Sequence, residues 1–564
     1  MKRISSATGY SRPELMALAI AVAAALGSVH SAQAVELGSS PDWNVQWNNT
    51  LQYNLGIRAR NPNGDIANNP IHAESEYKFD ERGDVVTNRF ALFSEIDAVY
   101  QGQMGVRVSA SAWKDFAYDD DAETKPGYPS NYQNREYSNY TKKYYMQGAQ
   151  LLDAFAFTKF QLFDRPSTLR LGRLTQYWGN SMFFSSLGAS YSQSATDLIK
   201  AAAAPGTLAK ELALPRGQIN FSTQLTDELS IGMQYFLEYE PDRLPQGGTF
   251  LAPVDFLFQG PDQFAALGGL VQRNSHEPKN INDNFGVNLR WSPSFTSSTF
   301  GMYYRQFDEA RAWAPFIYLN NGVPDSYSLA YAEGVKLFGL SVDQEIGGYS
   351  VGAEINYRHG TALKASNTVS SPDDIKGPRG NTLNILVNAQ KGLERTDFYD
   401  TGIAMFELGY VRKLKVTEHE ERYKGVGTQA CNSSVAGSSL SKGGRRTGCA
   451  TDETFLIAGL IEPQWLQVFS GVDLSMPVSV MYGISGFAAS ESVPVGEGDV
   501  NYSIGVRANI RQRYNVALQY NGAYGPSSGT SISPFDGSTY DTAGNNLYMS
   551  KDRQWWSLSA STTF

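Results

Sequence analysis

The sequence ends with the stretch Asp552–Phe564, which reads DRQWWSLSASTTF. From Trp556 onward, every second residue is apolar or weakly polar, and each residue between is Ser or Thr. A strict period of two indicates a β-strand with two different faces. The last strand of a soluble sandwich would leave an edge unpaired, whereas the last strand of a closed barrel pairs with the first. We therefore expect an all-β transmembrane barrel, with a soluble sandwich as the alternative.

The stretch Trp43–Arg58 repeats this alternation near the other end of the sequence, and only Asn49 interrupts its apolar face. An apolar face toward lipid and a polar face toward the lumen are typical of strands in membrane barrels. The apolar face carries Trp43, Val45, Trp47, Leu51, Tyr53, Leu55 and Ile57.

Residues 1–34 have the features of a secretory signal peptide. Lys2, Arg3 and Arg12 precede the apolar run 15–26, and Ala32-Gln33-Ala34 is a small-residue cleavage site. The apolar run is too short to span a membrane as a helix. We therefore divide the chain into a signal peptide, residues 1–34, and an outer-membrane barrel, residues 35–564.

The composition supports a barrel and excludes other classes. After residue 34 no apolar run is long enough for a transmembrane helix. Aromatic residues make up 12% of the chain and charged residues 18%, which is fewer charges than a typical soluble domain has. The formal net charge of -9 argues against nucleic acid as a partner.

Predicted strands alternate with short turns and long polar loops. This rhythm is typical of outer-membrane barrels, in which the turns are periplasmic and the loops extracellular. We count about eighteen antiparallel up-and-down strands, with sixteen as the alternative and 393–475 the hardest region to assign. An even number places both termini in the periplasm, and a C-terminal Phe564 on an alternating strand resembles the assembly signal of such barrels. The paired strands are 86–100 with 104–116, 150–163 with 167–178, 217–225 with 229–239, 284–291 with 299–307, 333–345 with 349–358, 382–391 with 401–415, 453–462 with 471–484, and 500–511 with 514–521.

Charged residues on the predicted strands fall on the polar faces. A charge facing lipid costs about 2–4 kcal/mol at the midplane, so these residues should face the lumen. Two roles are open: pairs of opposite charge that brace the wall, or a selectivity filter. The predicted lumen charges are Glu95, Asp97, Arg107, Asp153, Lys159, Arg170, Glu238, Arg290, Glu354 and Arg507.

Three segments between strands are unusually apolar. In 179–215 a helix can begin at Thr196 and end at Pro205, so this segment can fold into the barrel as a plug or remain a surface loop. The segments 249–271 and 313–319 can capture an apolar small molecule, or can pack on each other as a lid without a ligand. The candidate capture residues are Trp178, Met182, Phe183, Phe184, Phe250, Phe256, Phe258, Phe264, Trp313 and Phe316.

Cys431 and Cys449 are the two cysteines, and in an exported protein such a pair indicates a disulfide. A metal or redox site is the alternative, but no His lies nearby. The acidic run Asp119–Asp121 with Glu123 has no recognisable ligand spacing and fits a solvated loop better than a cation site. None of the four His residues after residue 34 stands in a recognisable Ser-His arrangement. We therefore expect no metal, no cofactor and no enzymatic activity.

Several motifs together resemble domain-of-unknown-function family 1302 (DUF1302), a group of proteobacterial outer-membrane proteins. They are 83–90 (GDVVTNRF), 152–155 (LDAF), 169–173 (LRLGR) leading to 178–179 (WG), 210–215 (KELALP), 347–358 (GGYSVGAEINYR) and 471–474 (GVDL). The resemblance implies an outer-membrane protein that passes hydrophobic compounds, comparable to fatty-acid transporters of the FadL type. It also implies a periplasmic lipid-binding-like protein and an inner-membrane pump as partners. It supplies no catalytic residues.

Taken together, the sequence predicts an outer-membrane channel for small hydrophobic compounds such as steroids, terpenes, fatty acids or hydrocarbons. Its surroundings would be outer-membrane lipid and lipopolysaccharide. Transport would be passive, because the sequence contains no nucleotide-binding or energy-coupling motif. The alternatives are a general water-filled porin, a barrel hydrolase, and a structural or secretion-partner barrel with a sealed lumen.

Overall fold

The structure is a computed structural model. It describes residues 35–36, 40–256, 258–263, 272–278, 281–366, 368–433, 444, 447–542, 544 and 547–564. The predicted signal peptide, residues 1–34, and the predicted capture residue Phe264 lie outside the described residues.

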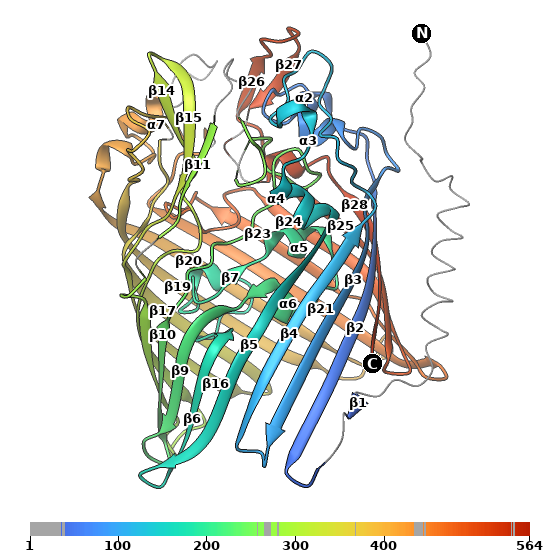
Figure 1. Cartoon of the computed structure of the whole chain (residues 1–564), viewed down its shortest axis with the longest axis vertical. Helices are drawn as coiled ribbons and strands as arrows, with labels where there is room; N and C mark the ends of the chain where they lie inside the picture. Colours follow the sequence, from blue (N-terminus) through green and yellow to red (C-terminus); the bar gives the residue numbers. More distant parts are fainter. Residues whose placement is uncertain are drawn as a thin grey trace.

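The main sheet is a closed antiparallel barrel of eighteen spans (Figure 1). The sheet has twenty strands, but β1 (Val35–Glu36) is a two-residue addition to β2, and β22 and β23 form one interrupted span. The spans are β2 (Trp43–Arg58), β3 (Val85–Tyr100), β4 (Met104–Asp115), β5 (Gln147–Leu162), β6 (Arg165–Leu174), β9 (Arg216–Gln224), β10 (Leu229–Phe236), β12 (Phe285–Trp291), β13 (Thr299–Phe307), β16 (Val335–Ile346), β17 (Tyr349–Ala362), β19 (Arg379–Leu393), β20 (Thr401–Glu418), β21 (Glu453–Phe469), β22 (Val472–Ser475) with β23 (Val478–Ser485), β24 (Val500–Ile510), β25 (Tyr514–Tyr524) and β28 (Trp555–Thr563).

The first and last spans close the barrel. Leu55 of β2 lies opposite Leu558 of β28, and Thr50 lies opposite Thr563. Phe564 continues the pairing, because its amide donates to the carbonyl of Asn49 at 2.8 Å. The expectation from the terminal stretch is therefore confirmed: the last strand has a partner on each side, β2 and β25.

The connections alternate between a turn end and a loop end of the barrel. The eight turns contain two to seven residues, and the nine loops contain 14 to 48. Several loops fold into small sheets of their own at the loop end, at the top of Figure 1. One sheet contains β11 (Gln272–His276), β14 (Phe316–Asn320), β15 (Val323–Ala330) and β18 (Thr368–Val369), and another pairs β26 (Gly529–Ile532) with β27 (Thr539–Thr542).

Helices are short and lie in the loops. They are α2 (Gly64–Ala67), α3 (Ala73–Tyr77), α4 (Asn139–Thr141), α5 (Leu198–Ala203), α6 (Ala209–Leu212) and α7 (Gln429–Ser433). Among the described residues, no helix has the length and apolar character needed to cross a membrane.

Large apolar side chains cover the outside of the barrel. They alternate along the strands with polar side chains that face the lumen, as the predicted period of two requires. Because such a continuous apolar exterior is unfavourable in water and favourable in hydrocarbon, it defines a lipid-facing surface. Exposed examples from twelve spans are Leu92, Val106, Leu171, Met302, Leu340, Ile355, Leu408, Ile461, Val480, Ile504, Leu518 and Trp556.

Neighbouring residues on β25 test this assignment. Leu518 is exposed on the outer face, whereas Gln519 faces the lumen, where its side chain lies against Gly505. Leu518→Arg should destabilise the barrel by about 2–4 kcal/mol, because it places a charge in lipid near the middle of the strand. Gln519→Arg should change stability far less. Urea unfolding from lipid vesicles measures both variants, and equal losses would contradict the assigned faces.

Most predicted strands differ from the observed ones in their bounds, and two of these differences affect the account. β6 ends at Leu174. Trp178, predicted at the end of this strand, therefore lies beyond it, and its side chain is buried. The predicted strand 471–484 is interrupted between β22 and β23 at Met476 and Pro477. Pro477 has no backbone N–H to donate to the ladder, which explains the break.

Candidate functional site

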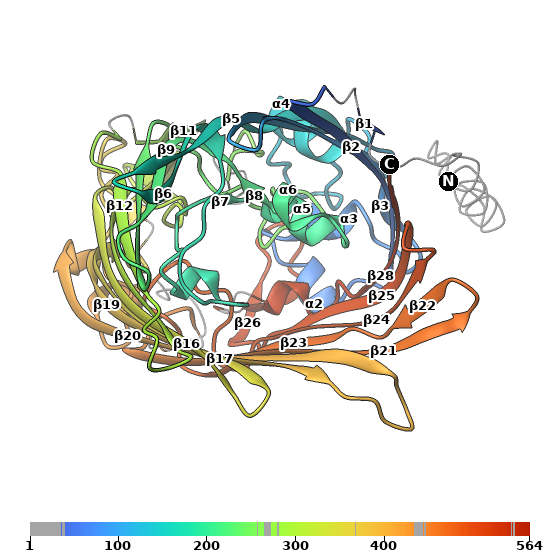
Figure 2. The same ribbon diagram turned by 90° about the horizontal axis from the view of Figure 1, so that it is seen from below.

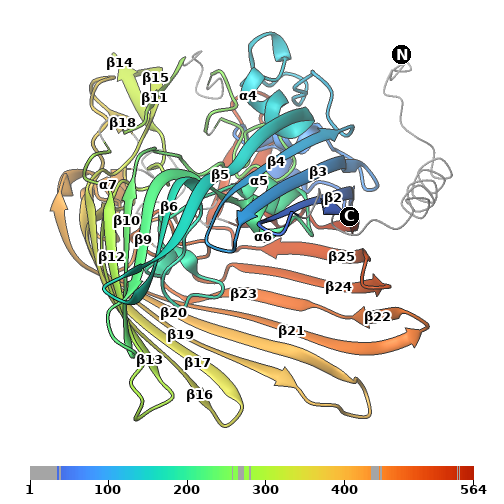
Figure 3. The ribbon, with the colours of Figure 1, turned by 60° about the horizontal axis from the view of Figure 1, so that its bottom comes forward.

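Residues 175–215, here called the inward segment, leave the wall after β6 and rejoin it at β9. Figures 2 and 3 show α5 and α6 inside the ring of strands. Within the segment, the two-residue strands β7 (Ala195–Thr196) and β8 (Ala213–Leu214) pair with each other. Asp197 caps α5 by accepting from the amide of Lys200 at 3.0 Å. The segment therefore has local structure, but the barrel wall supplies most of the contacts that hold it.

Two wall carboxylates bind backbone amides of the inward segment. Glu407 of β20 is fully buried and accepts from the amides of Met182 at 3.0 Å, Phe183 at 2.5 Å and Phe184 at 2.8 Å. Glu354 of β17 accepts from the amide of Asn180 at 3.0 Å and from that of Ala189. Hydrogen bonds to an ionised acceptor are about twice as strong as neutral ones, so these carboxylates fix the path of residues 180–189.

Three wall arginines bind backbone carbonyls of the same stretch. Arg216, Arg305 and Arg358 are each at most 1% exposed. Their guanidinium groups donate to the carbonyls of residues 186, 188, 189, 191 and 192 at distances from 2.6 to 3.2 Å. The wall thus holds the backbone of residues 180–192 in two ways: carboxylates bind its N–H groups, and guanidinium groups bind its carbonyls.

The C-terminal half of the inward segment is held by lysines. Lys210 of α6 pairs with Glu95 of β3 at 2.9 Å. Lys200 of α5 donates to Ser111 of β4 at 3.0 Å and pairs with Glu211 of α6 at 3.4 Å. The segment therefore touches the wall on both sides of the lumen.

The ten predicted lumen charges all lie on inward faces of the wall, and most of them have a partner of opposite charge or a backbone partner. Asp97 pairs with Arg107 through two bonds of 2.7 and 3.1 Å. Arg507 pairs with Glu462 at 3.0 Å and Arg290 with Asp343 at 3.9 Å. Such pairs are what the bracing role predicts, and both the bracing role and the selectivity filter stay predictions.

The remaining lumen charges have other neighbours on the wall. Glu238 pairs with Arg173, and the amide of Asp153 donates to Ser109 Oγ at 3.0 Å. Lys159 lies over the ring of Phe157 at 6.0 Å, and Arg170 lies between Phe157 and Asn220 in the strand register.

The predicted capture residues do not form one site, because seven of the ten are distributed over four separate apolar clusters. Trp178, Trp313 and Phe316 share a cluster with Tyr191 of the inward segment. Phe183 and Phe184 pack with wall residues of β19, β20 and β21. Met182 is partly buried beside them. The prediction grouped these residues because they are close in sequence, but the fold distributes them around the lumen.

The loops 249–263 and 313–319 do contact each other. Phe256 and Leu319 both pack against the cluster of Ile317 and Tyr327, and Phe258 is half-buried. Phe250 points instead into a cluster with wall residues and Ile199 of α5. The two loops therefore pack on each other, which is one of the two arrangements that the sequence allowed; residues 249–256 and 258–263 are called the lid below. Through Phe250, the lid also contacts the inward segment.

A small apolar pocket of about 10 Å³, room for about one water molecule, lies where these parts meet. Phe250 and Leu251 of the lid and Ile199 and Ala202 of α5 form one side of it. The other side comprises Val86, Thr87, Tyr118, Tyr145 and Trp555. A pocket of this size holds no solute, so the lid and α5 are closely packed here.

A buried ionic cluster fastens the first loop to the seam of the barrel. Glu76 of α3 pairs with Arg58, the last residue of β2, at 2.7 Å and with Arg553, just before β28. Both arginines and Glu76 are at most 1% exposed. Removing one partner of a buried pair leaves an uncompensated charge, so Glu76 is required for the closed arrangement of this loop.

A second buried pair links the first loop to the lid. Asp255 accepts from the amides of Glu74 at 2.8 Å and Ser75 at 2.9 Å. The Glu74 carboxylate accepts from Ser130 and Asn131. Burial, and secondly the Asp255 carboxylate, raise the pKa of Glu74 to about 8, and burial also raises the pKa of Asp255.

This pair predicts a lid that weakens as pH rises. Since the folded-state pKa of Glu74 is raised, protonation favours the closed loop, and its stabilisation is lost as pH rises toward that value. The charged groups that act on this pair are Asp255, which acts on Glu74, and Arg553, which acts on Asp255. Hydrogen exchange in α3 should therefore be faster at about pH 8 than at about pH 5, after correction for intrinsic rates. Glu74→Gln should reduce this difference, and an unchanged difference would contradict the assignment.

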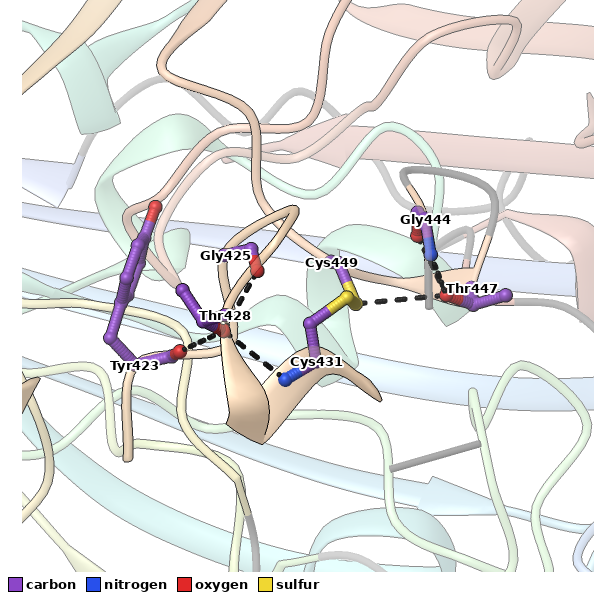
Figure 4. Close-up of a disulfide and its surroundings, with 7 residues drawn as sticks. All are labelled: Tyr423, Gly425, Thr428, Cys431, Gly444, Thr447 and Cys449. Atoms are coloured by element: carbon purple, nitrogen blue, oxygen red, sulfur yellow. Dashed lines mark hydrogen bonds between the residues drawn. A yellow bond between two sulfur atoms is a disulfide. The ribbon is translucent and has the colours of Figure 1, made fainter. Parts of the chain in front are cut away.

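The predicted disulfide joins Cys431 and Cys449, with a Cα–Cα distance of 5.7 Å (Figure 4). Thr428 supports it, because its hydroxyl accepts from the amide of Cys431 at 3.2 Å and donates to the carbonyl of Tyr423 at 2.8 Å. The bridge therefore staples the loop between β20 and β21.

The acidic run carries ion pairs. Lys78 pairs with Asp119 and Glu123, and Lys142 pairs with Asp120. Across the described part of the chain, no group of three His, Cys, Asp or Glu side chains is arranged to hold a metal ion.

The sequence pattern did not single out Glu407 or the three buried arginines as site residues. Arg358 and Glu407 are single charges on polar strand faces, like the ten that were named. Their partners are backbone groups more than 160 positions away, so no local pattern marks them.

A closed barrel with an apolar exterior and a charged interior defines a membrane-spanning β-barrel. The chain belongs to the DUF1302 family of proteins of unknown function, whose family profile matches residues 15–564. This confirms the resemblance seen in the sequence motifs.

Solved structures share the outline of this fold at low similarity. OpdK from Pseudomonas aeruginosa, solved with vanillate, is 8% identical with a TM-score of 0.37, over 92% of this chain and 98% of that chain. OccAB4 from Acinetobacter baumannii is 10% identical with a TM-score of 0.40, over 94% and 99%. A BenF-like porin from Pseudomonas fluorescens Pf-5 is 8% identical with a TM-score of 0.39, over 92% and 98%. At this level the similarity does not indicate which solutes this chain handles. Among curated proteins, no sequence matches this chain.

Proposed function

We propose that the protein is a passive outer-membrane channel for small hydrophobic compounds, in which the inward segment acts as a plug. Residues 1–34 would direct export, and both termini of the barrel would lie in the periplasm, with the loops outside the cell. Outer-membrane lipid and lipopolysaccharide would surround the barrel. A periplasmic lipid-binding-like protein and an inner-membrane pump are proposed partners for solutes that have crossed.

The observation that carries this proposal is the composition of the three large apolar clusters. Each combines side chains of the barrel wall, of the loops and of the inward segment. In the second cluster, for example, Phe250 of the lid, Trp113 of β4 and Ile199 of α5 lie together. Apolar contact surface therefore continues from the loop end into the lumen. An apolar solute can exchange one set of such contacts for another without becoming hydrated on the way.

The general water-filled porin is the second candidate, and the charges of the lumen favour it. Asp97, Arg107, Arg290 and Arg507 are partly exposed there, which suits a wet passage for polar solutes. The two candidates differ in the inward segment, because a general porin requires a path for water and ions beside it.

A substitution that fills the pocket tests the proposed route. Ala202→Phe forces a ring into the close packing of α5 with Phe250 and Leu251, where an apolar route past the inward segment would have to open. Apolar uptake should therefore fall several-fold while the barrel remains folded. Ala202→Ser keeps the size of the side chain and should retain uptake. The measurement is the rate of naphthalene uptake by cells whose outer membrane carries lipopolysaccharide. Undiminished uptake by Ala202→Phe would exclude this pocket from the route.

A further inference from the structure

Arg216, Arg305 and Arg358 form a row along one side of the lumen. They begin β9, lie within β13 and lie within β17, respectively. The row binds successive carbonyls of the inward segment: Arg358 binds residues 186 and 188, Arg305 binds residues 189 and 191, and Arg216 binds residue 192. A neutral carbonyl is a weaker acceptor for a guanidinium group than a carboxylate. The three cations are therefore held by acceptors that an anion can displace.

Arg305 leaves its carboxylate-binding edge unused. Its Nη1 donates to the carbonyls of Ala189 at 2.8 Å and Tyr191 at 2.6 Å. Its Nε and Nη2 are buried and have no hydrogen-bond partner among the described residues. These two nitrogens form the edge that binds a carboxylate through two parallel hydrogen bonds. A fully buried cation with two unsatisfied donors is costly, and a bidentate anion would satisfy both.

The carboxylates nearest to the row are engaged elsewhere. Glu354 accepts from amides of the inward segment, as described above, and Glu309 accepts from Thr361 and from the amide of Ala362. Among the described residues, no salt bridge joins Arg216, Arg305 or Arg358 to a carboxylate of this chain. Glu309 and Glu354 lie near enough to act on the charge of Arg358, and Asp308 on that of Arg216, whereas the charges that act on Arg305 are the two other arginines. The positive charge that lacks a paired carboxylate is therefore that of Arg305.

Aromatic rings border each arginine. Arg305 lies over Phe307 at 4.5 Å, Arg358 over Tyr191 at 4.0 Å and Arg216 over Phe236 at 4.1 Å. Phe307 and Tyr191 belong to the cluster that holds the predicted capture residues Trp178, Trp313 and Phe316. A cationic row beside an aromatic cluster matches a molecule with one anionic group on an apolar body.

We propose that Arg305, flanked by Arg216 and Arg358, binds the carboxylate of a small apolar carboxylic acid. The carboxylate takes the unused Nε and Nη2 edge of Arg305, and residues 186–192, whose carbonyls bind the other donors of the row, must move to admit it. An acid that takes the row displaces these carbonyls and loosens residues 186–192 from the wall, while its apolar body contacts the neighbouring rings. This inference rests on the proposed function and names the class of solute.

Isothermal titration of the purified full-length barrel with 2-naphthoate and with 2-naphthamide tests the proposal. The two probes have the same apolar body and differ in charge. The barrel should bind the acid at least about tenfold more tightly than the amide. Equal affinities would overturn the proposal, and this comparison on the unmodified protein requires no variant.

Substitutions then locate the site. Arg305→Gln should reduce the acid-to-amide affinity ratio to about one. Arg305→Lys should retain only part of the ratio, because an ammonium group cannot form two parallel hydrogen bonds to a carboxylate. The control Arg290→Gln removes a lumen arginine that pairs loosely with Asp343 and should keep the full ratio. A full ratio in a folded Arg305→Gln barrel would overturn the assignment.

The outcome is separable from that of the proposed function. If cells take up naphthalene through the barrel but the barrel binds acid and amide equally, the carboxylate site is wrong and the channel stands. If the barrel prefers the acid through Arg305 but gives no naphthalene uptake, the site stands and the broader hydrophobic channel is wrong.

Discussion

Glu407→Ala should turn a barrel of low ion conductance into an open one. The Glu407 carboxylate accepts three consecutive amides of the inward segment, and the substitution leaves these buried donors without their charged acceptor. Charge-assisted hydrogen bonds contribute about 1.5–3 kcal/mol each, so the combined loss should shift the population toward a displaced plug by about a hundredfold or more. Single-channel recording in planar bilayers measures the change directly.

Glu418→Ala is the matched control for this experiment. Glu418 ends the same strand, its side chain is exposed, and it pairs only loosely with Arg379 at 3.9 Å. Its loss should leave conductance unchanged. If Glu407→Ala remains as silent as the unmodified barrel, the hydrogen bonds of Glu407 do not hold a plug, and the role of the inward segment must be revised.

Glu76→Ala should release the first loop from the barrel seam. Its carboxylate lies between Arg58 and Arg553, and all three side chains are excluded from solvent. Removing Glu76 leaves Arg553 without its salt-bridge partner and leaves Arg58 only the Asp552 carboxylate at 3.8 Å, which costs about 3–5 kcal/mol. Proteolysis within residues 59–84 of the folded barrel should then accelerate by about a hundredfold or more, while the barrel itself remains intact.

Glu81→Ala provides the comparison within the same loop, because Glu81 is exposed. Its cleavage rate should match that of the unmodified protein. Equal rates for Glu76→Ala and Glu81→Ala would show that the ionic cluster does not fasten the loop.

The barrel could be predicted from the sequence because its determinant is local. A period of two survives in almost every span, and turns such as Gly347-Gly348 separate neighbouring strands by only a few residues. The strand count, the pairing of the first strand with the last and the inward faces of the charged residues all follow from these local patterns. The break at Pro477 was missed because a single proline does not disturb the alternation around it.

The arrangement inside the barrel depends on contacts between distant residues, which periodicity does not encode. Glu407 binds amides more than 220 positions earlier in the chain, and Arg305 binds carbonyls more than 110 positions earlier. The aromatic residues of three apolar segments were correctly recognised as unusual. Their distribution over four clusters, however, is set by which strand each segment leaves and where it rejoins the wall.

Solute uptake by intact cells tests the central claim most directly. Cells with a lipopolysaccharide-bearing outer membrane, with and without this protein, are compared for uptake of naphthalene and of a small sugar such as arabinose. The proposed function predicts faster uptake of naphthalene and unchanged uptake of arabinose. Faster uptake of arabinose with no change for naphthalene would contradict it and identify a general water-filled porin.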